Sequence, residues 1–374
     1  FAHSDADLSD ETKRFALSPT DIALLNPNTK TCPIFRSAQD AELTKSIYRR
    51  VPILVNESKG EAGNAWGISF RQGLFNMTSD SGLFRSAEEL EARGLKLEGN
   101  VWRDEENESA AFLPLYEAKM LHHFDHRWAT YDEAGDTRDV TLAEKQNADF
   151  VVTPRYWVEK SNVEERLKDK SDKEWLLGFR DICRNNDERT VIASILPSVG
   201  VGNNAPLMFF DKEPRQVACL VANLSSFALD WVARFKVGGV HLNFFIAQQL
   251  PVLPPSTYAS SAAWTDGATL GEWISSRVVE LCFTAHDLTA FARDCGFDGE
   301  PFGWDAERRF EVRCELDAAF FALYGLSMDE AAYVLDTFPI VKRKDEAKFG
   351  SYRTKTRILE LMAAMQSSSA AKNV

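Results

Sequence analysis

Residues 191–210, VIASILPSVGVGNNAPLMFF, indicate the fold class more clearly than any other stretch of the chain. Two β-prone apolar runs, 191–196 and 207–210, flank a segment rich in Pro, Gly and Asn. Short runs of this kind, bounded by such residues, are typical of strands joined by turns. The stretch therefore predicts a mainly β unit with irregular connections.

The sequence on either side extends this unit and adds a helix. Further β-prone runs lie at 150–153, 156–158 and 240–246. A helix is predicted over 217–235 because apolar residues fall on one of its faces. These residues are Val217, Leu220, Leu224, Phe227 and Trp231. Irregular strands with one or two packed helices make an α+β unit rather than a doubly wound sheet.

The sequence becomes helical after Pro254-Pro255 and a Ser/Ala-rich stretch at 256–264, which we interpret as a linker. The predicted helix over 306–323 ends before Gly325, a typical residue just beyond a helix, and Ser327–Glu330 is a capping-box sequence. An apolar stripe of Ile274, Val278, Leu281, Ala285 and Leu288 indicates another helix.

We therefore expect an α+β fold in three parts. Residues 1–109 form a connector with a helix over 38–51 and a β segment. Residues 110–255 form the irregular, mainly β domain with packed helices. Residues 256–374 form an α-helical C-terminal unit.

Length and charge limit the functional classes. The chain has 374 residues and a formal net charge of −13, which by itself opposes binding to phosphates. The charge is unevenly distributed: residues 86–117 carry nine acidic and three basic side chains, whereas 342–357 carry seven basic and two acidic ones. The net charge therefore leaves room for a local basic face.

Other bulk features concern the compartment. The six cysteines form no C-x-x-C pair, which favours reduced thiols and a cytoplasmic location. No apolar run approaches the ~18 residues of a spanning helix, so no membrane is expected as a partner. The first residue is Phe1, which indicates a fragment of a longer protein.

Two short motifs suggest chemistry and are weak. Residues 200–205, GVGNNA, fit G-x-G-x-x-A, but Pro206 and an apolar run follow where a dinucleotide site needs a helix. His122 and His126 are four residues apart, so a helix would place both on one face as a metal-dependent hydrolase requires. The general-base Glu of such enzymes is absent, because His123 takes its place. We therefore expect no metal, catalytic or cofactor residue in this chain.

A set of ordered segments resembles a known family. The segments are 17–37 (LSPTDIALLNPNTKTCPIFRS), 114–131 (PLYEAKMLHHFDHRWATY), 175–207 (WLLGFRDICRNNDERTVIASILPSVGVGNNAPL), 236–255 (KVGGVHLNFFIAQQLPVLPP) and 316–360. Their order resembles that of the C-terminal target-recognition region of type II and type IIG restriction-modification DNA adenine-N6 methyltransferases, including those of DISARM-type phage-defence systems.

The resemblance implies a division of labour. In the family, a catalytic core binds S-adenosylmethionine and holds the flipped base with an [N/D/S]-P-P-[Y/F] tetrapeptide, while the matched region recognises sequence. Residues 26–29 (NPNT) and 253–256 (LPPS) are not that tetrapeptide. We therefore expect residues 1–109 to follow a core outside this chain, 110–255 to recognise double-stranded DNA, and the chain not to be an enzyme by itself.

Arg forms paired hydrogen bonds with guanine and Asn with adenine, so the matched segments contain side chains suited to recognising base edges. A Gly238-Gly239 turn also allows close approach to a phosphate. The candidate DNA-binding residues are Lys119, His122, Arg127, Arg155, Arg180, Arg184, Arg189, Asn203, Asn204, Lys236, His241 and Asn243. The alternative for the charged members is a set of surface salt bridges.

Three functions are left open. In the first, the chain positions a DNA methyltransferase core on its target, with helicase or nuclease subunits as further partners. In the second, it is a protein-binding scaffold without DNA affinity, as the acidic surface and helical tail suggest. In the third, it is a metal-dependent hydrolase built on His122 and His126.

Overall fold

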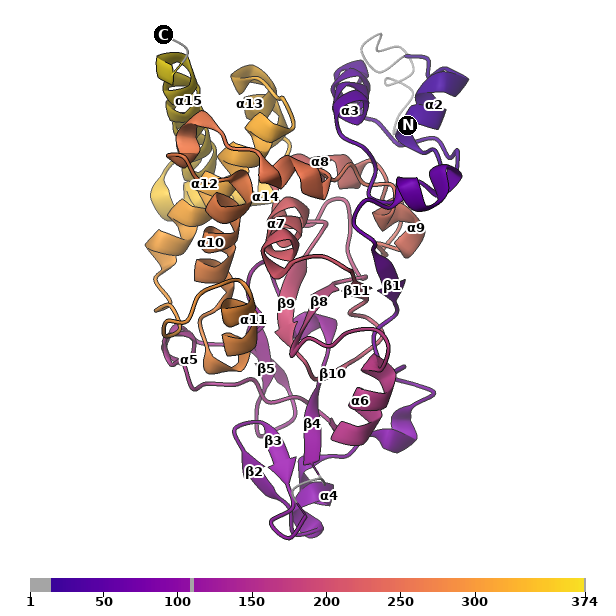
Figure 1. Cartoon of the computed structure of the whole chain (residues 1–374), viewed down its shortest axis with the longest axis vertical. Helices are drawn as coiled ribbons and strands as arrows, with labels where there is room; N and C mark the ends of the chain where they lie inside the picture. The colour runs from indigo at the N-terminus through magenta and orange to yellow at the C-terminus, as the bar shows by residue number, and fades with distance from the viewer. Residues whose placement is uncertain (1–14, 108–110, 373–374) are drawn as a thin grey trace.

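The chain forms two main sheets, one in the middle of the molecule and one that extends toward its lower end in Figure 1, and residues 191–210 contribute to both. We describe residues 15–107 and 111–372 of a computed structural model. The first sheet has the order β1-β11-β8-β9, with every pair antiparallel. Its strands are β1 (Ser69–Arg71), β8 (Trp175–Phe179), β9 (Ala193–Pro197) and β11 (Leu207–Phe209).

The second sheet has the order β10-β4-β3-β2, with β7 also paired to β4. Its strands are β2 (Lys96–Glu98), β3 (Val101–Arg103), β4 (Ala111–Tyr116), β7 (Trp157–Glu159) and β10 (Gly200–Val201). Only β10 runs parallel to β4; the other pairs are antiparallel. Because β10 lies between β9 and β11 in sequence, the chain leaves one sheet, joins the other for two residues and returns. A small hairpin, β5 (Ala129–Tyr131) with β6 (Thr137–Asp139), completes the β structure described.

Helices precede, connect and follow the strands along the chain. The helices before residue 256 are α2 (Pro19–Leu25), α3 (Ala38–Arg50), α4 (Ala87–Ala92), α5 (Leu142–Gln146), α6 (Lys160–Leu167), α7 (Pro214–Ser225), α8 (Phe227–Arg234) and α9 (Phe244–Ala247). The C-terminal helices are α10 (Leu270–Cys282), α11 (Thr289–Asp294), α12 (Ala306–Leu323), α13 (Met328–Asp336), α14 (Pro339–Phe349) and α15 (Arg353–Lys372). Short 3₁₀ helices lie at Glu57–Gly63, Ser81–Leu83, Ala118–Met120, Pro255–Ala259, Ala263–Thr265 and His286–Leu288.

The predicted α+β class with a helical C-terminal region is confirmed, and so are several helix ends. Gly325, with φ +71°, follows α12, and the Ser327 and Glu330 side chains cap α13 reciprocally. The helix predicted over 217–235 is two helices bent by 54°. Ser226 between them is extended, and its Oγ accepts from the Leu229 N–H, so it begins α8 instead of continuing α7.

Two predicted strands are wrong. Residues 150–153 form no strand, although Val152 O accepts from the Asn100 side chain. Residues 240–246 form a loop that enters α9, because their backbone bonds to the loop after β8 and does not join a sheet. The stretch at 256–264 is not an open linker, since Tyr258 is 3% exposed.

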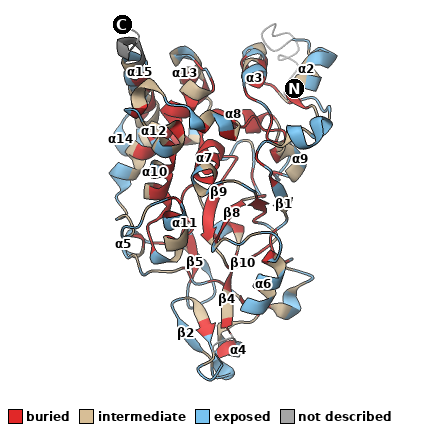
Figure 2. Cartoon of the chain, in the orientation of Figure 1, coloured by how far each residue is buried: buried red, intermediate tan, exposed pale blue. Residues whose placement is uncertain are grey.

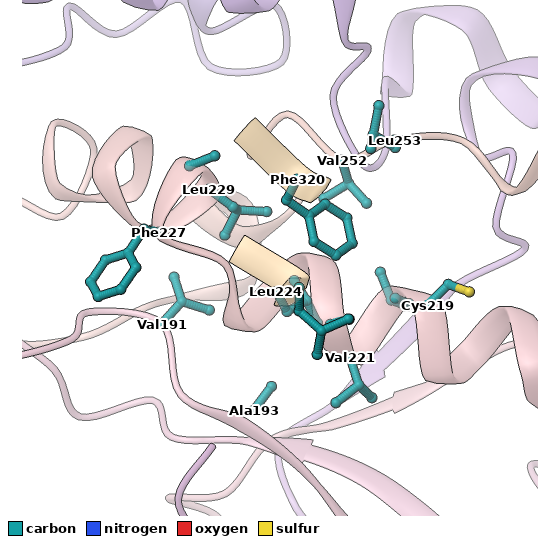
Figure 3. Close-up of a cluster of buried hydrophobic side chains, with 14 of the residues drawn as sticks. Val191, Ala193, Cys219, Val221, Leu224, Phe227, Leu229, Val252, Leu253 and Phe320 are labelled. Carbon is teal, nitrogen blue, oxygen red and sulfur yellow. The ribbon is translucent and has the colours of Figure 1, made fainter. Parts of the chain in front are cut away.

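One hydrophobic core joins all three predicted parts. It includes Leu43 and Ile47 of α3, Ile195 of β9, Val221 of α7 and Phe320 of α12. Figure 2 shows that burial is concentrated in α7, α8 and the strands beside them. Figure 3 shows this packing, with side chains of β9, α7, α8 and α12 in contact around Leu224. The helical C-terminal region therefore shares its core with the β domain.

Within the residues described, no single helix is long and apolar enough to cross a membrane. Helices α7 and α8 meet the criteria of length and composition only when taken together across their bend.

Candidate nucleic-acid interface

Four loops that are distant in sequence are hydrogen-bonded into one structure, which we call the loop cluster: residues 117–122, 180–187, 202–204 and 238–243. Asp181 N donates to Asn204 O (3.2 Å), and Leu242 N donates to Asp181 O (2.6 Å). Cys183 N donates to Val240 O (3.0 Å). The loop after β8 is therefore the centre to which the other loops attach.

The Arg180 side chain connects the fourth loop. Its Nε donates to Leu121 O at 2.8 Å and its Nη2 to Lys119 O at 3.3 Å. The guanidinium is half-buried, and burial lowers its pKa. Arg180 thus holds the 117–122 loop in place with donors that a purely DNA-reading arginine would leave open.

Most of the predicted DNA-binding residues lie on this cluster. Lys119, Arg184, Asn204, His241 and Asn243 are exposed on it, and His122, Arg180 and Asn203 are half-buried. Asn203 has a structural contact as well, because its Oδ1 accepts from Met77 N at 3.0 Å. His241 Nδ1 lies 3.5 Å from Asp181 Oδ2, which fixes the imidazole beside the central loop.

Arg155 is exposed but lies outside the loop cluster. Its guanidinium carbon is 5.3 Å from the centre of the Tyr156 ring. Its segment bonds to Tyr131 through Thr153 O (3.0 Å), and the Lys119 ammonium lies over the same Tyr131 ring. These contacts link the segment of Arg155 to the cluster through Thr153 and Tyr131, whereas the Arg155 side chain itself lies against Tyr156.

Two predicted DNA-binding arginines are wrong because both are buried. Arg127 is 0% exposed, and its guanidinium donates to the backbone carbonyls of residues 145, 147, 150 and 284. Arg189 is 5% exposed, and its Nε donates to Asp230 Oδ2 at 2.9 Å while its Nη2 donates to Ser225 O. Both guanidiniums hold chain segments together and cannot reach a ligand on the surface.

The assignment of Lys236 to DNA is also wrong. Its ammonium donates to Leu25 O at 2.6 Å and to Asn26 Oδ1, at the C-terminal end of α2. Burial lowers the pKa of Lys236 to about 7. The side chain therefore attaches the segment after α8 to the C-terminal end of α2, where the last helix carbonyls accept hydrogen bonds.

The histidines do not form a metal site. His122 and Asp125 pair as an isolated bridge, and Phe124 between them has φ +56°, so the helix that would align His122 with His126 is absent. His122 stacks on Trp128 at 4.3 Å between ring centroids, whereas His126 Nε2 bonds Asp287 at 2.8 Å. In the part of the chain that is described, no three His, Cys, Asp or Glu side chains are grouped to hold a metal. The helical His122/His126 pair on which the metal-hydrolase hypothesis was based is therefore not formed.

The G-x-G-x-x-A motif also has no helix after it. Gly200 lies in β10, and the next element is β11, as the apolar run predicts. A Cβ on Gly200 would be 2.7 Å from Val158 Cγ2, so this glycine permits close packing of strands.

The basic segment 342–357 is largely neutralised within the molecule. Five of its seven basic side chains form ion pairs: Lys342–Glu346, Lys344–Glu188, Arg353–Glu307, Lys355–Asp336 and Arg357–Glu311. Surface pairs of this kind contribute little to stability. They do reduce the charge that this segment can offer to phosphates.

Sequence reasoning missed the apolar side chains of the interface. Ile182, Val240 and Phe245 are 53%, 47% and 52% exposed, on or directly beside the loop cluster. Ile182 and Val240 lie in loops and Phe245 lies in α9, but a single exposed apolar residue is common, so the sequence carries no distinct signal. Only the pairing of Ile182 with His241 shows that these side chains share one surface.

Comparison with protein-family models finds none that matches this chain, and comparison with curated proteins finds no match either. The family resemblance therefore depends on the ordered segments 17–37, 114–131, 175–207, 236–255 and 316–360.

Proposed function

We propose that this chain is a sequence-specific DNA-recognition module in which the loop cluster contacts base edges in a groove. One observation carries the proposal: the hydrogen bonds that join four loops present Lys119, Arg184, Asn204, His241 and Asn243 together. These are donors and acceptors suited to base edges, and exposed apolar groups such as Ile182 suit thymine methyl groups.

The charge of the cluster determines what kind of binding to expect. The four loops contain three Lys or Arg side chains (Lys119, Arg180 and Arg184) and three Asp or Glu side chains (Glu117, Asp181 and Asp187). Because the balance is near zero, affinity from phosphate neutralisation at the cluster itself is small. We expect recognition to depend on base contacts and on positive groups outside these loops.

By the family resemblance, we further propose that the module positions an adenine-N6 methyltransferase core that binds S-adenosylmethionine. That core, and helicase or nuclease subunits, would be partners of this chain in a restriction-modification or phage-defence system. The lack of enzyme activity in this chain and its cytoplasmic location remain predictions.

Binding of fluorescent duplex DNA by the whole chain tests the proposal. We expect measurable affinity at low salt that weakens as salt rises, and about 1–3 kcal/mol weaker binding to a preferred site for Arg184→Ala. Arg93→Ala is the matched control, because Arg93 is exposed at the end of α4, far from the loop cluster in Figure 1. Equal effects of the two substitutions would contradict the assignment of Arg184.

A protein-binding scaffold is the second candidate, favoured by the exposed Ile182, Val240 and Phe245. It predicts no duplex affinity at any salt concentration. Phe245→Ser would then abolish association with a partner subunit, whereas Arg184→Ala would not affect it.

A further inference from the structure

A pocket of about 170 Å³ lies between α3, α8 and α13, beside the loop cluster but outside it. Figure 1 shows α8 between α3 and the C-terminal helices. The residues lining the pocket are Arg36, Ser37, Asp40, Trp231, Arg234, Phe235, Tyr333 and Thr337. None of them was a candidate from the sequence.

The pocket wall carries more positive than negative charge. Arg36 is exposed and has no ion pair or hydrogen bond to any residue the structure describes. Arg234 is 6% exposed, and its pKa is lowered to about 10, first by burial and also by the nearby Arg189 and Arg36. Asp40 is the one carboxylate in the wall, and its Oδ1 already accepts from the Tyr333 hydroxyl at 2.9 Å.

Several hydrogen-bond donors at the pocket lack acceptors. The indole N–H of Trp231, a side chain 1% exposed, has no hydrogen-bond partner among the described residues. Arg234 Nε has no hydrogen bond to them either, but it lies 3.9 Å from the Asp230 carboxylate. Ser37 is the N-cap of α3, whose first turn leaves backbone N–H groups without intrahelical partners and carries a partial positive charge. An unpaired arginine such as Arg36, together with donors that have no hydrogen-bond acceptor, is a feature of an oxyanion site.

We propose that this pocket binds a phosphate group, held by Arg36, Arg234 and the N-terminus of α3. The phosphate belongs either to the DNA backbone or to free phosphate. The position favours DNA, because Arg234 Nη2 donates to Asp187 O (2.6 Å) at the end of the central loop. Phe235 also lines both this pocket and the neighbouring groove beside residues 239–243.

Titration of the whole chain with inorganic phosphate, followed by calorimetry, tests the pocket without DNA. We expect one phosphate site per chain. Arg36→Ala should lower the phosphate affinity of this site about tenfold or more, and Arg36→Lys should lower it less. Arg36 is exposed on a loop, so the melting temperature without phosphate should stay unchanged, and Arg93→Ala is the control. Absence of phosphate binding, or equal binding by Arg36→Ala, would overturn the proposal.

A second measurement identifies the source of the phosphate, and only this part depends on the proposed function. If the DNA backbone supplies the phosphate, Arg36→Ala removes about one phosphate contact. The slope of the logarithm of the duplex-binding constant against the logarithm of salt concentration then becomes shallower by about one. An unchanged salt dependence with lost phosphate binding assigns the pocket to free phosphate. Phosphate binding by a chain without any duplex affinity would contradict the DNA-recognition function and leave the pocket proposal standing.

Discussion

At the scale of single residues, burial separates the arginines that hold the fold from those available to a ligand. Arg189 and Arg184 are five residues apart in one polar segment, and the sequence makes them look equivalent. Arg189 turns inward because Asp230 is 0% exposed in α8 and needs a cation, while Arg184 stays in solvent. The partner comes from 41 positions away, which no local pattern reveals.

This difference predicts opposite effects on stability. Arg189→Ala removes the donor that lies 2.9 Å from the buried Asp230 carboxylate and leaves Arg234 Nε, at 3.9 Å, as its charged partner, so we expect a loss of about 3 kcal/mol in the free energy of unfolding. Arg184→Ala removes an exposed side chain, so its change should stay within about 0.5 kcal/mol. Urea unfolding of both variants measures this, and similar losses would show that the arginines are not distinguished by burial.

A buried carboxyl gives a pH-dependent prediction. Asp317 of α12 accepts from Phe227 N at 2.7 Å, and burial raises its pKa to about 6. Since the folded pKa exceeds the unfolded one, stability from this group is present at low pH and is lost as pH rises from about 4 through 6. Asp317→Asn keeps an acceptor for Phe227 N without the charge.

We therefore expect Asp317→Asn to raise the free energy of unfolding at pH 7.5 by up to about 3 kcal/mol and to change it little at pH 4. Chemical unfolding at the two pH values measures the difference. A variant less stable than the native chain at pH 7.5 would contradict the assigned cost of the buried charge.

At the scale of elements, the sequence predicted those parts that local rules determine. The ends of α12 and α13 follow from Gly325 and the Ser327 capping box, and β9 and β11 follow from their apolar runs. The break at Ser226 and the loop at 240–246 depend on distant groups, such as Asp317 at the start of α8 and Asp181 beside Leu242. Apolar periodicity does not report such contacts.

The crossing of β10 between the sheets gives a prediction for glycine. A Cβ on Gly200 meets Val158 Cγ2 at 2.7 Å, whereas one on Gly303 meets nothing within 4 Å. We expect Gly200→Ala to destabilise the chain by about 1–3 kcal/mol and Gly303→Ala to be tolerated. Thermal unfolding compares them, and an unaffected Gly200→Ala would show that the strands do not pack so closely.

At the scale of the whole molecule, the three predicted parts are not independent in their packing. Asp287 and Asp294 of the C-terminal region bond His126 and Trp175 of the β domain, and one core spans both. The sequence indicated a boundary near 256 because the apolar period changes there. A change of period marks a change of secondary structure and does not show where a core ends.

We therefore expect the whole chain to unfold in one cooperative transition. Calorimetry combined with circular dichroism measures this, and the calorimetric and van't Hoff enthalpies should agree. Two separate transitions, one of them retained after removal of residues 256–374, would contradict a shared core.

Selection of duplexes from a random library by the whole chain tests the central claim most directly. If the loop cluster recognises base edges, successive rounds enrich one defined DNA sequence. Asn243→Ala then reduces the base preference at one position of that sequence. Retention of duplexes without any enriched sequence, or a sequence unchanged by every substitution of the exposed polar residues in the loop cluster, would contradict the account.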